Sequence, residues 1–479
     1  MTKVVLLILL GALPIFAGLR NLSLHQALKI LDKNNLEIKI SQYESMMKYY
    51  DKKAVDAMRW GKADISITAL RSNDAGNVFG FKLQSREANF ADFGFSDFMG
   101  ALGQGVMQSA MMNGGVPSFP LFAQGLAKNG DKILSIEPKD LNYPGARNHF
   151  LTKFTYMLPI YTGGKITEYQ NITQGLFEMS QLDARKLRNE KIFQVKKTFH
   201  DITLVNDFIY SLRKIRRNMQ YLKRTIVEMK KEGYTKNTDI LEIDAKLAEV
   251  DSMLNQAKLN RELAYQFLSF LLNRKVSSIK RVRTHLKVPR VTKKDIERLS
   301  LDIQKAKLGL KISEHAVKAQ KANFLPTVGG FAEYGSADDK LWNEFGKKDF
   351  YTVGIQVKMN LFNGGADKAK LEKARLQRLK VAQQVELAKK GIALQVKKIK
   401  SSIRSLSYRL RSARKQLRLA KEVYKTYEEK YKVGLASITD LLIKQSIELQ
   451  VLMQYLQVAN QRNTKILELQ KILDFGGRR

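Results

Sequence analysis

The sequence predicts a membrane protein of mixed α and β class, in which four β-strands per chain join long α-helices. Three observations predict this class: motifs that recur at a constant spacing, a helical seam of apolar residues, and segments in which apolar and polar residues alternate. Residues 1–17 place one lysine before a short apolar run, which predicts a signal peptide. No later stretch is apolar enough for a spanning helix, so we expect any membrane domain to consist of strands.

The chain is internally duplicated. Gly163 recurs as Gly364 and Asp239 recurs as Asp440, and both pairs lie 201 residues apart. The first helices of the two halves match at an offset of 265 instead, so the first half carries an insertion of 64 residues. A constant offset between separate landmarks indicates two copies of one structural unit.

Each half is expected to run helix, strand, loop, strand, long helix, turn and return helix. The expected segments are first-half helices (18–62), a strand pair (63–158) with a long extracellular loop (73–148), a helical hairpin (159–272, turn 233–239), an equatorial linker (273–291), a second-half helix (292–325), a strand pair (326–362), a second hairpin (363–473, turn 434–440) and a C-terminal tail (474–479).

The two long helices, expected over 163–231 and 364–432, have a narrow apolar stripe. In the second, apolar residues step by four and three from Ile399 through Ile403, Leu406 and Leu410 to Tyr431. This spacing of 3.5 residues predicts coiled-coil packing. At 1.5 Å per residue each helix would extend roughly 100 Å.

The strands alternate as strands between lipid and water do. Tyr351, Val353, Ile355 and Val357 alternate with polar or small residues. Four strands leave two unpaired edges, and closure in lipid needs about eight strands or more. A dimer would supply eight strands around a filled interior, whereas a trimer would supply twelve around an open pore, so we favour a trimer. The alternative is a soluble sheet packed on the helices.

Composition excludes several function classes. The net charge is +37, but residues 364–432 hold 21 Lys and Arg against 6 Asp and Glu, as on a solvated helix face, and no nucleic-acid motif is present. The chain has no cysteine, and its five histidines are dispersed: His25, His149, His200, His285 and His315. We therefore expect no metal, no cofactor, no nucleic-acid partner and no enzymatic activity.

The repeated motifs resemble those of the TolC-like outer-membrane efflux protein family over residues 20–473, the insertion excepted. They are Asn34-Asn35-Leu36, Asn323-Phe324-Leu325-Pro326, the two Gly-Gly turns, and Tyr431-Lys432-Val433-Gly434 followed by Thr439-Asp440. The resemblance implies a homotrimer with a twelve-stranded barrel in the outer membrane and a twelve-helix periplasmic tunnel. It also implies a periplasmic adaptor and an inner-membrane transporter of RND or ABC type, for efflux or type I secretion. The rival hypotheses are a structural or adhesive coiled-coil surface protein and a soluble periplasmic adaptor.

The two helix-tip turns have two interpretations. In the structural one, Gly233 and Gly434 end the long helices in left-handed conformations, and Thr238 and Thr439, or the aspartates beside them, cap the next helices. In the functional one, Asp440 and Asp239 ring the periplasmic aperture and attract cations.

The resemblance adds a gate to the functional interpretation. In the family the second-half aspartate, here Asp440, lines the closed entrance. A further acidic position is Ile443 here, for which Glu242 is a candidate substitute, and a basic latch position is Ala436. Tyr431 matches the tyrosine of the latch, so a latch through Asp239 and Tyr431 would lack one partner.

Two other features complete the expectations. Structural strand-to-helix turns are expected at Pro159, Gly163, Gly164, Gly364 and Gly365. The insertion is rich in Phe and Met, and three interpretations stay open for it: a lid over the barrel mouth, a disordered loop, or an adhesive surface.

Overall fold

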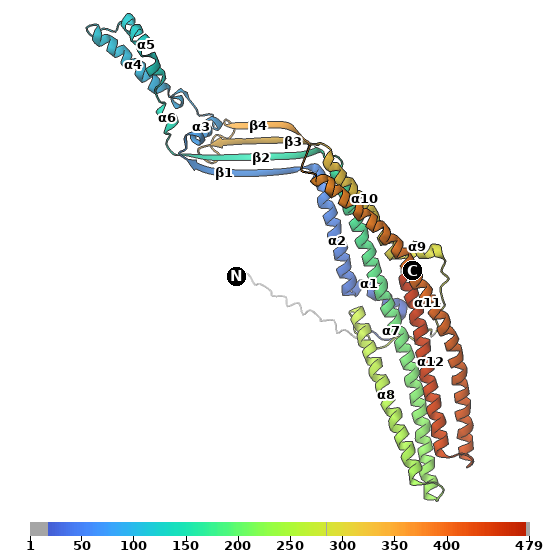
Figure 1. Cartoon of the computed structure of the whole chain (residues 1–479). Coiled ribbons are helices and arrows are strands. Elements are labelled where there is room, and N and C mark those ends of the chain that lie inside the picture. Colours follow the sequence, from blue (N-terminus) through green and yellow to red (C-terminus); the bar gives the residue numbers. More distant parts are fainter. Residues whose placement is uncertain (1–17, 284, 476–479) are drawn as a thin grey trace, which may run out of the picture. The chain divides into compact units, whose positions relative to one another are not determined.

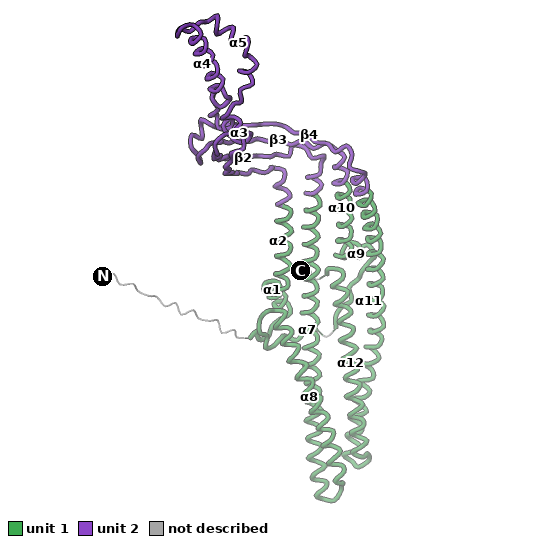
Figure 2. Tube along the Cα trace, turned by 60° about the vertical axis from the view of Figure 1, so that its left-hand side comes forward, with its two compact units in different colours: residues 1–52, 171–317, 372–479 green, residues 53–170, 318–371 purple. Residues whose placement is uncertain are grey.

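A computed structural model describes residues 18–283 and 285–475 (Figure 1). The expected signal peptide and the last residues of the expected tail lie outside the described residues. The chain forms two compact units, residues 1–52, 171–317 and 372–479 in one and residues 53–170 and 318–371 in the other (Figure 2). Each unit therefore takes segments from both halves of the sequence repeat.

Unit 2 contains one antiparallel sheet in the order β1-β2-β3-β4. The strands are β1 (Lys62–Ser72), β2 (Arg147–Tyr161), β3 (Thr327–Asp338) and β4 (Asp349–Lys358). Four strands per chain were predicted, and the structure confirms them. β4 ends at Lys358, so the alternation seen in the sequence beyond this residue does not belong to the strand.

The register places apolar side chains on one face. Ile65 lies opposite Phe154, Phe154 opposite Tyr334, and Tyr334 opposite Tyr351. This face is exposed in the chain, with Ile65 73%, Tyr351 79% and Ile355 71% accessible. On the other face Lys153 and Glu333 form an ion pair of 3.1 Å. The sheet thus has one apolar and one polar face, and among the described residues β1 and β4 each pair with one strand only.

Unit 1 contains two helical hairpins of equal design. α7 (Lys165–Lys231) and α11 (Ala366–Lys432) both have 67 residues, and α7 begins within unit 2. Their return helices are α8 (Asn237–Leu272) and α12 (Ile438–Ile472). The apolar seams are buried, for example at Leu212, Met219 and Ile403. The predicted long helices and their seam are confirmed.

The shorter helices are each broken once, which the sequence did not predict. α1 (Leu24–Asn34) and α2 (Leu36–Ala57) meet at Asn35, and α9 (Lys293–Leu299) and α10 (Leu301–Lys321) meet at Ser300. These breaks are 265 residues apart, the offset of the repeat. Asn35 stabilises its break because its Oδ1 accepts the Ile38 N–H at 2.9 Å and its amide donates to the Leu271 carbonyl at 2.8 Å.

Between α8 and α9, the described residues 273–283 and 285–292 form no helix. Leu19 and Leu22 form parallel bridges with Val276 and Ile279 of this segment. The bridge at Leu22 adjoins an apolar cluster that contains Phe199 and Leu268. Close packing accounts for the order of a linker without regular structure.

The insertion between β1 and β2 is helical. It comprises α3 (Ala75–Gln84), η2 (Phe90–Phe93), α4 (Phe95–Met112), α5 (Phe119–Leu134) and α6 (Lys139–Asn142). The connection expected over 73–148 therefore contains helices, which argues against the disordered-loop interpretation and leaves the lid and the adhesive surface open. α4 and α5 pack against each other as an antiparallel pair, and α3 packs against β3 (Figure 1).

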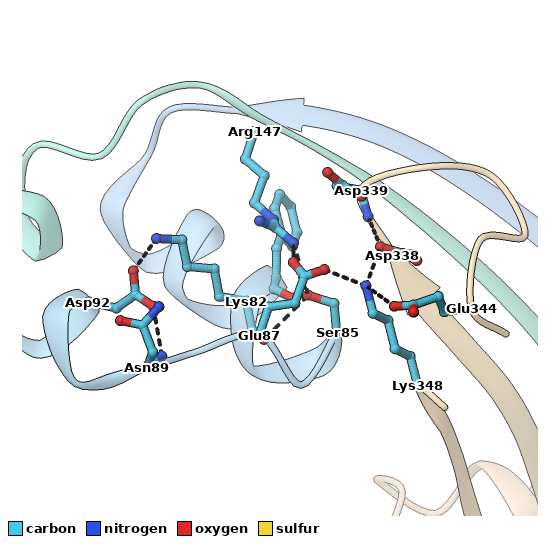
Figure 3. Close-up of polar contacts among 11 residues, drawn as sticks. Lys82, Ser85, Glu87, Asn89, Asp92, Arg147, Asp338, Asp339, Glu344 and Lys348 are labelled. Atoms are coloured by element: carbon cyan, nitrogen blue, oxygen red, sulfur yellow. Dashed lines mark hydrogen bonds and ion pairs between the residues drawn. The ribbon is translucent and has the colours of Figure 1, made fainter. Parts of the chain in front are cut away.

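An ion-pair cluster ties the insertion to the ends of the strands (Figure 3). Glu87, which follows α3, is bridged by Arg147 of β2 and by Lys348 beside β4. The Lys348 ammonium is 9% exposed and also lies 2.8 Å from Asp338 Oδ1. Oxygens of Glu87, Asp338 and Asp339 lie within 4.8 Å of one another. Because Lys348 already balances Glu87 and Asp338, this group is a structural anchor.

In the part of the chain that the structure describes, no helix is both long and apolar enough to span a membrane.

Candidate functional site

The candidate site is formed by the two helix-tip turns of unit 1. α7 ends at Gly233 with φ +82° and α11 ends at Gly434 with φ +77°. The N–H of Gly434 donates to the Tyr431 carbonyl at 3.1 Å, and the N–H of Leu435 donates to the Lys430 carbonyl at 2.9 Å. This pair of bonds is the Schellman motif, and it recurs at Gly233. Both glycines therefore occupy conformations that other residues adopt at a cost.

The N-caps of the next helices lie two residues before the threonines. The N-cap of α12 is Ser437, whose Oγ accepts the Asp440 N–H at 3.0 Å, while the Asp440 carboxylate accepts from the Ser437 hydroxyl at 2.7 Å. At α8 the cap is Lys236, and its N–H donates to Asp239 at 3.1 Å. The expectation that Thr238 and Thr439 cap these helices was wrong, because the capping box places the cap three residues before its acidic partner. The two aspartates complete the caps instead.

Thr439 has a different contact. Its hydroxyl donates to Glu242 Oε2 at 2.8 Å, which joins the start of α12 to the first turns of α8. Both side chains are exposed. This bond links the tips of the two hairpins within one chain, and the sequence did not predict it because the partners lie 197 residues apart.

Tyr431 is buried in the apolar cluster of the tips, beside Ile226, Ile243 and Leu441. Its hydroxyl has no hydrogen-bond partner in the structure. Burial, and secondarily the negative charge of Asp239, raises the pKa of Tyr431. Tyr431 lies near Asp239, but among the described residues no hydrogen bond joins them, so the latch through Asp239 and Tyr431 stays a hypothesis.

Asp440 is exposed at the tip of the second hairpin. Hydrogen bonds from the Ser437 side chain and backbone, aided by the charge of Lys444, lower the pKa of the Asp440 carboxyl below its ordinary value. The side chain therefore carries a full negative charge at neutral pH, and this charge faces solvent.

The strand-to-helix turns have left-handed glycines. Gly163 and Gly164 have φ of +62° and +82°, and Gly364 and Gly365 have +66° and +84°. A Cβ on Gly163 would lie 2.9 Å from the Ala322 carbonyl oxygen, so this position also excludes a side chain by space. The register of β2 shifts between Pro159 and Tyr161, where proline supplies no N–H.

Comparisons with known proteins show which family model and which solved structures this chain resembles. A family model described as outer membrane efflux protein matches residues 294–474. The CmeC outer membrane channel of Campylobacter jejuni shares the fold with a TM-score of 0.71 and 15% identity, over 95% of this chain and 86% of that chain. The open state of the MtrE outer membrane channel of Neisseria gonorrhoeae matches at 0.71 and 13%, over 94% and 88%. The outer membrane protein VceC of Vibrio cholerae matches at 0.69 and 12%, over 94% and 95%.

Residues 294–474 thus resemble the outer membrane efflux protein family, and the fold of solved outer membrane channels is shared over 94–95% of the chain. No curated protein matches it in sequence. The family-model match supports, over residues 294–474, the resemblance found in the repeated motifs. The solved structures extend the shared fold to the first half of the chain, which the family model does not cover.

Two structural features escaped the sequence analysis. One is Ser437, which the pattern Ser-x-x-Asp could have identified as a capping box. The other is the Glu87–Lys348 anchor, for which no sequence signal exists because its members lie 261 residues apart.

Proposed function

We propose that this protein is one subunit of a homotrimeric export channel in the outer membrane, a passive conduit rather than an enzyme. The observation that carries this proposal is the four-stranded sheet, which exposes an apolar face and leaves β1 and β4 without partners at the edges. Lipid cannot satisfy unpaired backbone groups, so the edges must pair between copies. Three copies supply twelve strands, which leave an open lumen, whereas eight strands leave a filled one.

The periplasmic partners follow from the same assembly. The helical hairpins would line a tunnel toward a periplasmic adaptor and an inner-membrane pump of RND or ABC type, with small molecules or proteins as cargo. The channel has no energy source of its own in this proposal. Co-purification after crosslinking in cells tests it, and recovery of an inner-membrane transporter is the expected result.

A matched pair of substitutions tests the barrel. Val353 lies on the apolar face and is 72% exposed, whereas the next residue toward the N-terminus, Thr352, lies on the polar face opposite Glu333. A lysine on a lipid-facing strand costs about 2–4 kcal/mol at mid-membrane, while a lumen position tolerates it. Val353→Lys should therefore abolish membrane insertion and conductance in planar bilayers, and Thr352→Lys should preserve both. A soluble sheet would accept Val353→Lys without loss, which would refute the proposal.

We further propose that Asp440, Asp239 and Glu242 of three copies surround the periplasmic aperture. Support comes from the exposed charge of Asp440 and from the Thr439–Glu242 bond, which holds a second carboxylate at the same tips. Stacked carboxylates in a narrow opening bind cations and reduce conduction. Loss of divalent-cation block in Asp440→Ala channels tests this role.

The insertion is proposed as a lid over the outer mouth. Deleting residues 95–134 removes the α4–α5 hairpin but keeps the Glu87 anchor, and it should raise basal antibiotic permeability of cells. Unchanged permeability with normal channel assembly would count against the lid.

A further inference from the structure

The α4–α5 hairpin differs in composition from the rest of the chain. Residues 98–127 contain no Asp, Glu, Lys, Arg or His, although 27% of all residues are charged. The nearest ionisable side chains are Asp97, in the first turn of α4, and Lys128, within α5. Thirty consecutive uncharged residues would be unusual on an ordinary solvated surface.

The helices of this hairpin are held together from within. A Cβ on Gly105 of α4 would lie 3.4 Å from the Phe122 ring of α5, and the Ser109 hydroxyl accepts the Ser118 N–H at 3.4 Å. At the base, Asp97 accepts the Lys139 N–H at 3.0 Å. The apolar residues described next are therefore not needed to close the hairpin.

Those outer residues form exposed stripes. On α4, Met99, Gly103, Met107 and Met111 are spaced four apart, and the three methionines are 49%, 63% and 76% exposed. A Cβ added at Gly103 would have no other atom within 4 Å, so this glycine leaves an open gap in the row of methionines. On α5 the stripe contains Phe119, Leu126 and Leu134, with Phe119 79% exposed. Rows of residues four apart are the ridges through which helices pack on other helices.

The absence of charged side chains between residues 98 and 127 indicates which kind of partner the surface of this hairpin can bind. Helices that lie on membranes carry Lys or Arg beside their apolar face, and this hairpin has none between residues 98 and 127. Neither helix of the hairpin has the length and apolarity of a membrane span. Copies of a chain with net charge +37 repel one another, so contacts between copies favour an uncharged segment. Methionines adapt their shape to such contacts.

We propose that the α4–α5 hairpins of neighbouring copies pack on one another through the Met99–Met107–Met111 stripe. This inference rests on the proposed trimer. The insertion starts after β1, an edge strand, and its Glu87 reaches Lys348 beside β4, the other edge strand, so the segment that carries the hairpin extends across the strand ends to both edges that would adjoin neighbouring copies. The contact between hairpins would extend the contact between the sheets of neighbouring copies by a layer of helices.

Site-specific crosslinking tests this interface, because the chain has no cysteine and each introduced thiol is unique. Met107→Cys and Met111→Cys proteins, purified in detergent as the full chain, are treated with a short bismaleimide. Lys139→Cys, exposed in α6 outside the hairpin, is the matched control. The double variant Ile67→Cys and Val353→Cys, on the two edge strands, reports sheet assembly independently.

We expect covalent dimers from both methionine positions, because one thiol per chain joins two chains only, at a yield at least about fivefold above that of Lys139→Cys. Edge-strand crosslinks without methionine crosslinks would overturn the hairpin interface and leave the proposed channel intact. Absence of both would overturn the trimer itself. A dye on Met107→Cys that is quenched by brominated lipid after reconstitution would show a lipid contact and would also overturn the inference.

Discussion

The start of α12 provides a sharp test of the tip geometry. Ser437→Ala removes the hydroxyl that both donates to the Asp440 carboxylate and accepts the Asp440 N–H. Thr439→Val is the matched control, because it changes a neighbouring hydroxyl and leaves both cap bonds in place. Its only lost contact is the exposed bond to Glu242.

The expected magnitude follows from the bonds removed. Replacing an N-cap serine by alanine costs about 1 kcal/mol of local helix stability, within a range of about 0.5–2. At 1.36 kcal/mol per factor of ten, this is about a fivefold increase in the opening of the first helical turn. The exposed bond of Thr439 does not hold the backbone of this turn, so Thr439→Val should change opening by less than about twofold.

Amide hydrogen exchange with mass spectrometry measures this opening in the full-length protein in detergent. Peptides from the start of α12 should exchange about fivefold faster in Ser437→Ala, and peptides from the start of α8 should not change. Equal acceleration in Thr439→Val, or acceleration in that variant alone, would refute the assignment of the cap to Ser437.

Three further predictions follow. Asp440→Ala channels should lose most divalent-cation block in planar bilayers. Because the helix-cap serine lowers the pKa of Asp440 below 3.8, wild-type block should persist from about pH 7 to about pH 5, and block that fades in this range would contradict the assignment. Tyr431→Phe should leave channel opening and thermal stability unchanged, because the hydroxyl it removes has no hydrogen-bond partner; a loss of either would reveal a hidden contact. Lys348→Met removes the cation that pairs with the buried Asp338, so protease cleavage in the insertion should accelerate about tenfold or more, whereas the exposed Lys347→Met should match wild type. Burial raises the pKa of Glu87, but hydrogen bonds from Lys348 and Arg147 outweigh it and bring that pKa below 4.5, so the anchor should hold above this pH and loosen only as pH falls further. Faster cleavage already at about pH 6 would contradict this account.

The helical hairpins were predictable because their signals are local. The step of four and three along α11 specifies one buried stripe, and the glycines at positions 233 and 434 specify where each long helix ends. Strand alternation was equally readable, since side chains of a strand point to alternate faces.

The tip site was predictable only in part. The sequence located the turn and its aspartates, but not which side chains meet there. Tyr431 is buried without a bond to Asp239, and Thr439 bonds to Glu242 of the other hairpin. Such pairs depend on how α8 and α12 pack, which no local pattern specifies.

By itself, the sequence determined the duplication, the lengths of α7 and α11, the four strands and the turns between them. Each depends on period or backbone conformation within a few residues. Only the tertiary structure decided the break at Asn35, whose amide reaches the Leu271 carbonyl, and the anchoring of the insertion through Lys348. These features depend on hydrogen bonds and ion pairs between polar groups more than 200 residues apart. A buried polar group needs a partner, but the sequence does not show which residue that partner is.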